Sequence, residues 1–130
     1  MPHIVVEYSR NLEVRLDIRA LVENVHAAVL STRVFDLGAV RTRAEPRNLY
    51  VIADGDPDNG FVHVAMHIAP GRDGDTRKRV AQTILDAVAA ATQDVYERYG
   101  LGLSVEVREI DNSGAVRLNN LHERMTAKAN

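Results

Sequence analysis

The N-terminal stretch Met1-Pro2-His3-Ile4-Val5-Val6-Glu7-Tyr8 places a proline directly before a segment with the pattern of a β-strand. Ile4, Val6 and Tyr8 alternate with the other residues, which is the period of a half-buried strand. Met1 is usually removed before proline, so we expect Pro2 to become the N-terminus. A free α-amino group titrates near about 7.7–8.0, so the Pro2 nitrogen would be able to act as a general base near neutral pH. The alternative is that Pro2 merely follows a start codon.

The first half of the chain continues with a helix and a second extended region. Apolar residues at spacings of three and four predict an amphipathic helix over about 15–31. Asp36 and Gly38 mark a turn, and residues 39–44 and 49–53 are expected to be extended, split near Pro46. A polar loop over 54–60 ends this half.

The second half repeats the plan. Residues 61–68 form the next expected strand, and Asp73 or Asp75 can cap a helix whose apolar positions run to Val95. A final strand is expected over 103–107, followed by a turn at 111–114. The small, polar tail from Thr126 is expected to fray.

These patterns predict one domain, 1–130, of the α+β class with an α/β-like order. Two tandem β-α-β units, about 2–53 and 60–110, would form a four-stranded mixed sheet with two helices on one face. The opposite face would lie in solvent or against another subunit, and the sequence leaves both possibilities open. It carries Val5, Phe61, His63, Ala65, His67, Ser104, Glu106 and Arg108.

Composition excludes several classes of protein. The 130 residues include no cysteine, so disulfides, thiolate metal sites and cysteine nucleophiles are ruled out, as fits a reducing cytoplasm. The formal net charge of −2 gives nucleic-acid binding little electrostatic support. We expect neither a signal peptide nor a membrane span, because no apolar run has the length of either.

Arginines near the ends of two predicted strands are the main binding candidates. Arg41 and Arg43 lie on one side of a strand, and Arg72 follows Pro70-Gly71. A guanidinium is a permanent planar cation that can bind a carboxylate through two hydrogen bonds. The run Arg77-Lys78-Arg79 lies at a helix start, where cations are unfavourable unless an anion binds nearby. Each of these side chains has the alternative of simple solvation at the surface.

Other polar clusters give weaker signals. His63 and His67 lie four residues apart, with His3 as a candidate neighbour, but no third ligand has convincing metal-site spacing. Asp54, Asp56 and Asp58 lack the later glycine and glutamate of a calcium-binding loop. The acid/base candidates Glu7, Glu45 and Glu106 are better explained as surface or structural residues.

Five segments together resemble the 5-carboxymethyl-2-hydroxymuconate isomerase family of the tautomerase superfamily. They are MPHIVVE at the N-terminus, GAVRTR near 40, FVHVAMHI at 61–68, HIAPGR ending at Arg72 and NNLH at 119–122. No single motif is specific, but their order and spacing are. The resemblance covers nearly the whole chain and implies the tautomerase fold in a homotrimer.

The resemblance implies a cofactor-independent isomerase in which Pro2 is base and then acid, with Arg41 and Arg72 as catalytic and substrate-binding residues and Arg43 as a further binding residue. It implies no metal, no nucleic acid and no membrane partner. The substrate would be 5-carboxymethyl-2-hydroxymuconate, a small carboxylate of homoprotocatechuate breakdown in the cytoplasm. The alternatives are another tautomerase, a dehalogenase with a carboxylate beside Pro2, or a non-catalytic binding or assembly protein on the same fold.

Overall fold

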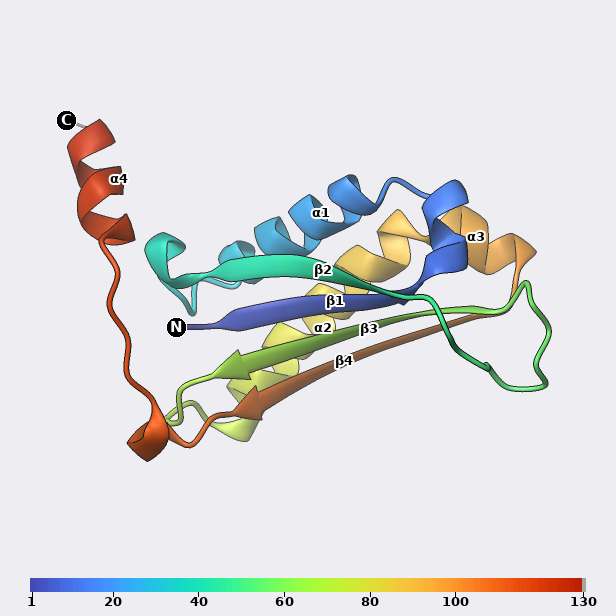
Figure 1. Ribbon diagram of the computed structural model, residues 1–130. Coiled ribbons are helices and arrows are strands. Elements are labelled where there is room, and N and C mark those ends of the chain that lie inside the picture. Colours follow the sequence, from blue (N-terminus) through green and yellow to red (C-terminus); the bar gives the residue numbers. More distant parts are fainter. Residues whose placement is uncertain (130) are drawn as a thin grey trace.

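A computed structural model describes residues 1–129 and contains one four-stranded sheet. Its strands are β1 (His3–Ser9), β2 (Arg41–Arg47), β3 (Gly60–Ile68) and β4 (Leu101–Glu109), in the order β2-β1-β3-β4. The pairs β1–β2 and β3–β4 are parallel, and β1–β3 is antiparallel. The mixed sheet built from two β-α-β units, which the sequence predicts, is therefore confirmed (Figure 1).

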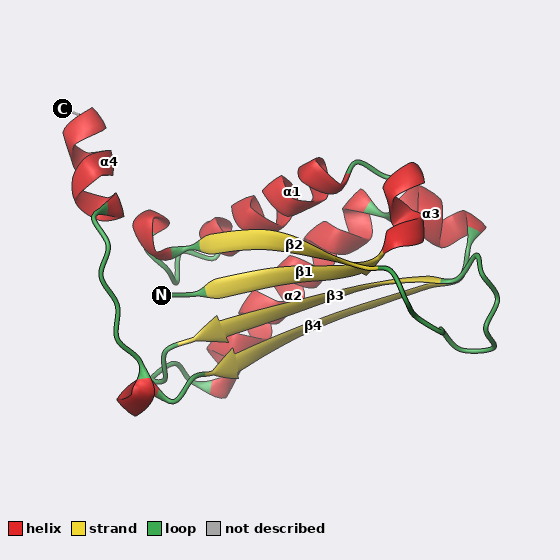
Figure 2. Ribbon diagram, in the orientation of Figure 1, coloured by secondary structure: helices red, strands yellow, loops and turns green. Residues whose placement is uncertain are grey.

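Helices cover one face of this sheet. They are α1 (Ile18–Ser31), α2 (Gly74–Ala91) and the short α3 (Gln93–Arg98), and Figure 2 shows them on the same side of the strands. Each long helix begins at an aspartate that accepts a hydrogen bond from its first turn. Asp17 accepts from the Ala20 N–H at 3.0 Å, and Asp73 accepts from the Thr76 N–H at 2.8 Å.

The core lies between the sheet and these helices. Alternate side chains of β1 and β3 point toward α1 and α2, whose buried residues recur at helical spacing. Burial of this apolar surface is the main force that holds the helices on the sheet. The most buried members are Ile4, Val6, Val62, Val64 and Met66 from the strands, and Leu21, Val25, Val29, Val80, Ile84 and Val88 from the helices.

The other face of the sheet is polar and open. Its cross-strand rows include Glu7 beside His63, and Arg47 donates to Glu7 with its Nε at 2.9 Å. His63 Nδ1 lies 2.7 Å from the Ser104 hydroxyl. Within residues 1–129, no helix combines the length and the apolar character needed to cross a membrane.

Four details differ from the sequence-based expectation. Pro46 lies inside β2 rather than splitting it, because β2 is an edge strand and an edge tolerates a residue without an N–H. Residues 49–53 form no strand. The second helix is interrupted at Thr92, and the expected frayed tail is instead helix α4 (Leu121–Ala129); Asn130 lies outside the described residues.

Strand directions bring three distant segments together at one end of the sheet. Because β1 is parallel to β2, His3 pairs with Arg41 at the start of both strands. Because β1 is antiparallel to β3, His3 also pairs with His67, near the end of β3. The N-terminus, the start of β2 and the loop after β3 therefore meet at this edge.

Candidate active site

Pro2 is buried where the chain enters β1. Its carbonyl accepts a hydrogen bond from the Arg41 N–H at 3.1 Å, which ties the N-terminus to the start of β2. Pro2 lines a pocket of about 160 Å³ together with Met1, Val34, Phe35, Asp36, Ala39, Ile68, Ala69 and Arg72. The proline that the sequence singles out thus lies at the wall of a cavity.

Arg72 reaches this pocket from the loop after β3. Gly71 has φ +124°, a conformation that glycine adopts without strain, and its N–H donates to Glu109 Oε2 at 3.2 Å. The Arg72 guanidinium lies over the Phe35 ring, 4.6 Å from its centroid. It also donates to the Val34 carbonyl at 3.4 Å. Aromatic and backbone contacts therefore hold the cation in place and leave its charge unneutralised.

Arg41 and Arg43 have different surroundings although they share one side of β2. Arg41 is half-buried, and its Nη1 donates to the Ala39 carbonyl at 2.9 Å. Arg43 is exposed, and its Nη1 lies 3.1 Å from His3 Nδ1 on the open face of the sheet. Pro2 and Arg72 therefore line one pocket, Arg41 contacts its wall at Ala39, and Arg43 lies on the open face of the sheet.

Positive charge dominates the electrostatics of this end of the sheet. Burial lowers the pKa of the Met1 α-amino group below its ordinary value of 8.0, and the charges of Arg117, Arg41 and Arg72 lower it further. Without Met1, the Pro2 amine would lie about one residue spacing, roughly 3.8 Å, from the position of that amino group. The same causes would then act on it.

Histidine near the site is kept neutral. Burial and then the neighbouring charges of Arg43, Arg41, the N-terminus and His67 lower the pKa of His3 below 6.5. Within residues 1–129, no three histidine, aspartate or glutamate side chains are grouped as a metal ion would require. His3 therefore adds no charge to the site at neutral pH.

The basic run at the start of α2 does not converge on the pocket. The Arg77 guanidinium lies 3.6 Å from Glu109, and Arg79 donates to the Thr32 carbonyl at 3.3 Å. Asp73 supplies the anion that the helix N-terminus favours. The arrangement of this run is explained by contacts within the chain, without an external anion.

The glutamates named from the sequence also lie elsewhere. Glu7 and Glu45 pair with Arg47 at 2.7 and 3.3 Å, and Glu106 pairs with Arg108 at 2.7 Å. The carboxylate that does line the Pro2 pocket belongs to Asp36, which the sequence marks only as a turn residue. An aspartate two residues before a glycine is typical of a turn, so the sequence gives no signal that Asp36 lines a pocket.

Phe35 is another residue of the pocket that the sequence does not reveal. It contacts Arg72 across 37 positions of the chain, a proximity that only the folded sheet creates. Asn119 is also nearby, since its side-chain amide lies 3.4 Å from Met1 Sδ. The C-terminal segment therefore reaches the N-terminus, a proximity that no local sequence pattern indicates.

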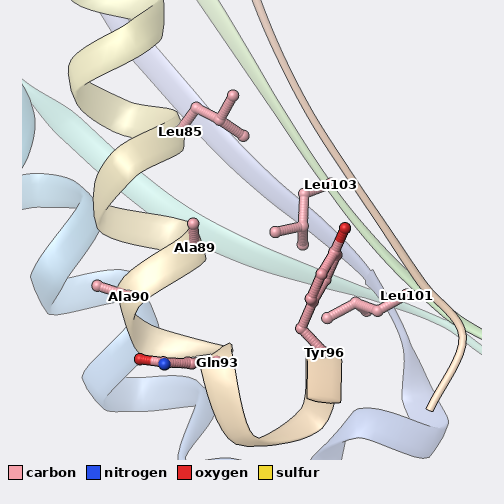
Figure 3. A pocket seen from close by; sticks show the side chains of 7 residues that line it. All are labelled: Leu85, Ala89, Ala90, Gln93, Tyr96, Leu101 and Leu103. Carbon is pink, nitrogen blue, oxygen red and sulfur yellow. The ribbon is translucent and has the colours of Figure 1, made fainter. Parts of the chain in front are cut away.

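A larger hollow of about 580 Å³ lies between α2, α3 and β4 (Figure 3), and it shares no lining residue with the Pro2 pocket. Its walls are mainly the apolar side chains Leu85, Ala89, Ala90, Leu101 and Leu103, with Gln93 and Tyr96 at one end. It holds no carboxylate, imidazole or cation for acid–base chemistry. Size alone therefore does not make it the reactive site.

Comparison with known proteins agrees with this assignment of the fold. The family model for 5-carboxymethyl-2-hydroxymuconate isomerase matches residues 2–125. The 5-carboxymethyl-2-hydroxymuconate Delta-isomerase of Escherichia coli is 28% identical over 122 residues, which cover 94% of this chain and 97% of that protein.

Solved structures give the same result. A 5-carboxymethyl-2-hydroxymuconate isomerase from Deinococcus radiodurans R1 has a TM-score of 0.88 at 28% identity, covering 95% of this chain and 93% of its own. A symmetric trimer described as Q0 fused 4-OT wild type shares the fold, with a TM-score of 0.70 at 18% identity and coverage of 90% and 92%. The chain therefore belongs to the 5-carboxymethyl-2-hydroxymuconate isomerase family and is an isomerase on the tautomerase fold.

Proposed function

We propose that this isomerase uses Pro2, freed by removal of Met1, as the base and acid in the isomerisation of 5-carboxymethyl-2-hydroxymuconate, a step of homoprotocatechuate breakdown. The observation that carries the proposal is the position of Pro2, buried in the wall of a pocket that Arg72 shares and bonded through its carbonyl to Arg41. The family name supports the choice of substrate.

The proposed reaction moves one proton and consumes nothing. The neutral Pro2 amine takes a proton from the enol oxygen or the allylic carbon of the substrate, and the electron pair shifts through the conjugated double bonds. The protonated amine then returns a proton to another carbon, which restores the free base. Because one group serves in both steps, the proposed chemistry requires no cofactor.

Arginines would bind and polarise the substrate. Arg41 and Arg72 are each able to hold a carboxylate through two hydrogen bonds, and their charges stabilise the negative oxygen that develops during proton transfer. Both side chains are half-buried, so their interactions are stronger than those of fully solvated cations. Arg43 lies farther from Pro2 than these two arginines, and its positive charge would assist binding of the anionic substrate.

The proposal is tested by following the ultraviolet absorbance of 5-carboxymethyl-2-hydroxymuconate with wild-type protein whose intact mass shows that Met1 is absent. Turnover faster than the uncatalysed reaction is expected. Correctly processed protein that leaves the substrate unchanged would reject this substrate.

The pH dependence should report the pKa of the Pro2 amine. The neutral amine is the base, so kcat/KM should rise with pH through that pKa and then level off. Arg41 lowers the pKa of the Met1 amine, and we expect it to act in the same way on the Pro2 amine once Met1 is removed; Arg41→Gln should then raise the pKa of Pro2 and move the acidic limb of the kcat/KM profile to higher pH. Arg43→Gln is the matched control, since Arg43 is not among the causes of that shift. An unmoved limb in Arg41→Gln would contradict the assignment.

We also infer a homotrimer. The structure described as Q0 fused 4-OT wild type, which shares this fold, is a symmetric trimer. This chain exposes apolar side chains that a partner would cover, among them Leu49 at 96%, Val116 at 98% and Leu118 at 97% exposure. Sedimentation equilibrium should give three times the 14.4 kDa mass of the chain, and a single-chain mass across micromolar concentrations would contradict the inference.

Asp36 supports a second candidate, the addition of water to an unsaturated acid. A carboxylate beside Pro2 can activate water, and Asp36 lines the same pocket. The test is release of chloride from a chlorinated acrylic acid. Chloride release by wild type that is lost in Asp36→Asn would favour water addition. No chloride release from a preparation that isomerises its substrate rapidly would exclude water addition.

A further inference from the structure

The C-terminal segment after β4 returns to the N-terminus and packs against the loop that lines the Pro2 pocket. Figure 1 shows residues 112–129 running as an arm from the end of β4, past the N-terminus, to α4. Gly38 in the loop permits a close approach, because a Cβ at that position would lie 2.8 Å from Met125 Cε and 3.2 Å from the His122 backbone nitrogen. The arm therefore forms a wall at the end of the sheet that carries Pro2.

The arm encloses a second hollow beside that pocket. The hollow measures about 110 Å³ and is lined by Asp36, Gly38, Ala39, Asn119 and His122. Asp36 and Ala39 also line the pocket of Pro2 and Arg72, so the two hollows are neighbours with a common wall. Neither arginine nor lysine is among the residues that line the second hollow, so it lacks the usual partner of a carboxylate. A ligand held at Pro2 could extend a neutral polar group into it.

Hydrogen bonds fix the direction of the Asn119 side chain. Its Oδ1 accepts from the Leu121 N–H at 3.1 Å, at the start of α4, which leaves Nδ2 as the end of the amide that is able to donate to a ligand. Nδ2 donates to Met1 Sδ at 3.4 Å, and a thioether sulfur is a weak acceptor. Met1 also lines the Pro2 pocket. Removal of Met1 would therefore free a hydrogen-bond donor at the edge of that pocket.

The Asp36 carboxylate supplies an acceptor at the same hollow. Asp17 and Asp73 each accept from a backbone N–H of the helix that they begin. Asp36 also begins a helical turn, but within residues 1–129 its side chain makes no such capping bond. An acceptor from Asp36 and a donor from Asn119 are complementary to a hydroxyl group, which donates through its hydrogen and accepts through its oxygen.

We propose that Asn119 and Asp36 are specificity residues that bind the hydroxyl group of a 2-hydroxy acid whose carboxylate is held by Arg72. This inference rests on the proposed function, whose substrate, a 2-hydroxymuconate, carries such a hydroxyl. Asn119 is able to donate to the substrate oxygen in the hydroxy form and in the keto form that loss of the enol proton leaves, whereas Asp36 accepts only from the hydroxy form. The pair therefore favours binding of the hydroxy form over the keto form.

The saturated acids 2-hydroxyadipate and adipate test this inference. They differ by one hydroxyl, match the carbon chain of muconate and have no double bond to isomerise. Calorimetric titration of wild type that lacks Met1 should show about 10-fold tighter binding of 2-hydroxyadipate, the range of one hydrogen-bonded hydroxyl. Asn119→Ala and Asp36→Ala should each bring the two acids to within about threefold. Wild type that binds the two acids equally, or binds neither, would overturn the inference.

Asn119→Asp separates ligand binding from the start of α4. Ionised aspartate still accepts from the Leu121 N–H but has no donor for a ligand. Asn119→Asp should therefore keep the hydrogen-exchange protection of α4, which Asn119→Ala should lower, and should still lose the preference for 2-hydroxyadipate. A purely structural Asn119 would give the opposite result, an Asn119→Asp protein that keeps the preference. The matched control is Asn120→Ala, an exposed neighbour that lines neither hollow and should behave as wild type.

These measurements also separate this inference from the proposed isomerisation. If the preference for 2-hydroxyadipate depends on Asn119 and Asp36 while processed wild type leaves 5-carboxymethyl-2-hydroxymuconate unchanged, the isomerase proposal fails and the binding role stands. If wild type isomerises that substrate, but Asn119→Asp keeps both the preference and the wild-type kcat/KM, the isomerase proposal stands and the role of Asn119 is wrong.

Discussion

Replacing Pro2 with alanine is expected to lower kcat/KM for 5-carboxymethyl-2-hydroxymuconate by about 10²- to 10⁴-fold, the usual contribution of a positioned acid–base group. Alanine still permits removal of Met1, so the variant also begins with a free amine. It loses the pyrrolidine ring that is buried in the pocket wall and that fixes the direction of the secondary amine. A primary amine on a smaller side chain would be poorly aligned with the substrate.

The control for this substitution is Pro46→Ala, in the exposed edge strand β2. It should retain wild-type kcat/KM, and circular dichroism should show that both variants are folded. If Pro2→Ala kept more than about a third of the activity, Pro2 would not be the base.

Arg72→Gln is expected to reduce kcat by about 10²- to 10³-fold, comparable to the loss of one donor to a developing oxyanion. Glutamine retains a polar group but loses the charge and the stacking of the guanidinium over Phe35. The predicted effect falls on kcat as well as kcat/KM, because the charge on the substrate oxygen grows only as the proton moves.

Lys78→Gln on α2 is the matched control, since it removes one exposed cation near Arg72 in the sequence without touching the pocket. It should leave both parameters within about twofold of wild type. A rise in KM alone in Arg72→Gln would limit Arg72 to ground-state binding of a carboxylate and contradict its role in the transition state.

Much of the fold is predictable from local patterns. The alternation of Ile4, Val6 and Tyr8 predicts β1, and the helical spacing of apolar residues predicts α1 and α2, because each pattern matches one buried face. The prediction that Pro46 splits the second extended region was wrong. A strand tolerates proline when it lies at the edge of a sheet, as β2 does, and local sequence does not show that position. Whether a strand is at an edge is decided by the tertiary arrangement.

The candidate site divides in a similar way. Pro2, Arg41 and Arg72 can be singled out from the sequence because each lies near the end of a predicted strand. The family resemblance and the chemistry of an amine or a guanidinium point to the same three residues. Phe35 and Asp36 could not be singled out, because their relation to Pro2 arises only when the segment before η2 (Leu37–Ala39) folds against the N-terminus. Arg43 remains a prediction, and its contact with His3 places it on the open face of the sheet.

The central claim is that a free Pro2 amine is the base. Its most direct test compares preparations that differ only in the fraction of chains retaining Met1, with the fraction measured by intact mass and lowered by methionine aminopeptidase. We expect turnover of 5-carboxymethyl-2-hydroxymuconate to rise in proportion to the chains that lack Met1. Chains that retain Met1 should contribute none, because their Pro2 nitrogen is an amide. Equal turnover by protein that fully retains Met1 would contradict it.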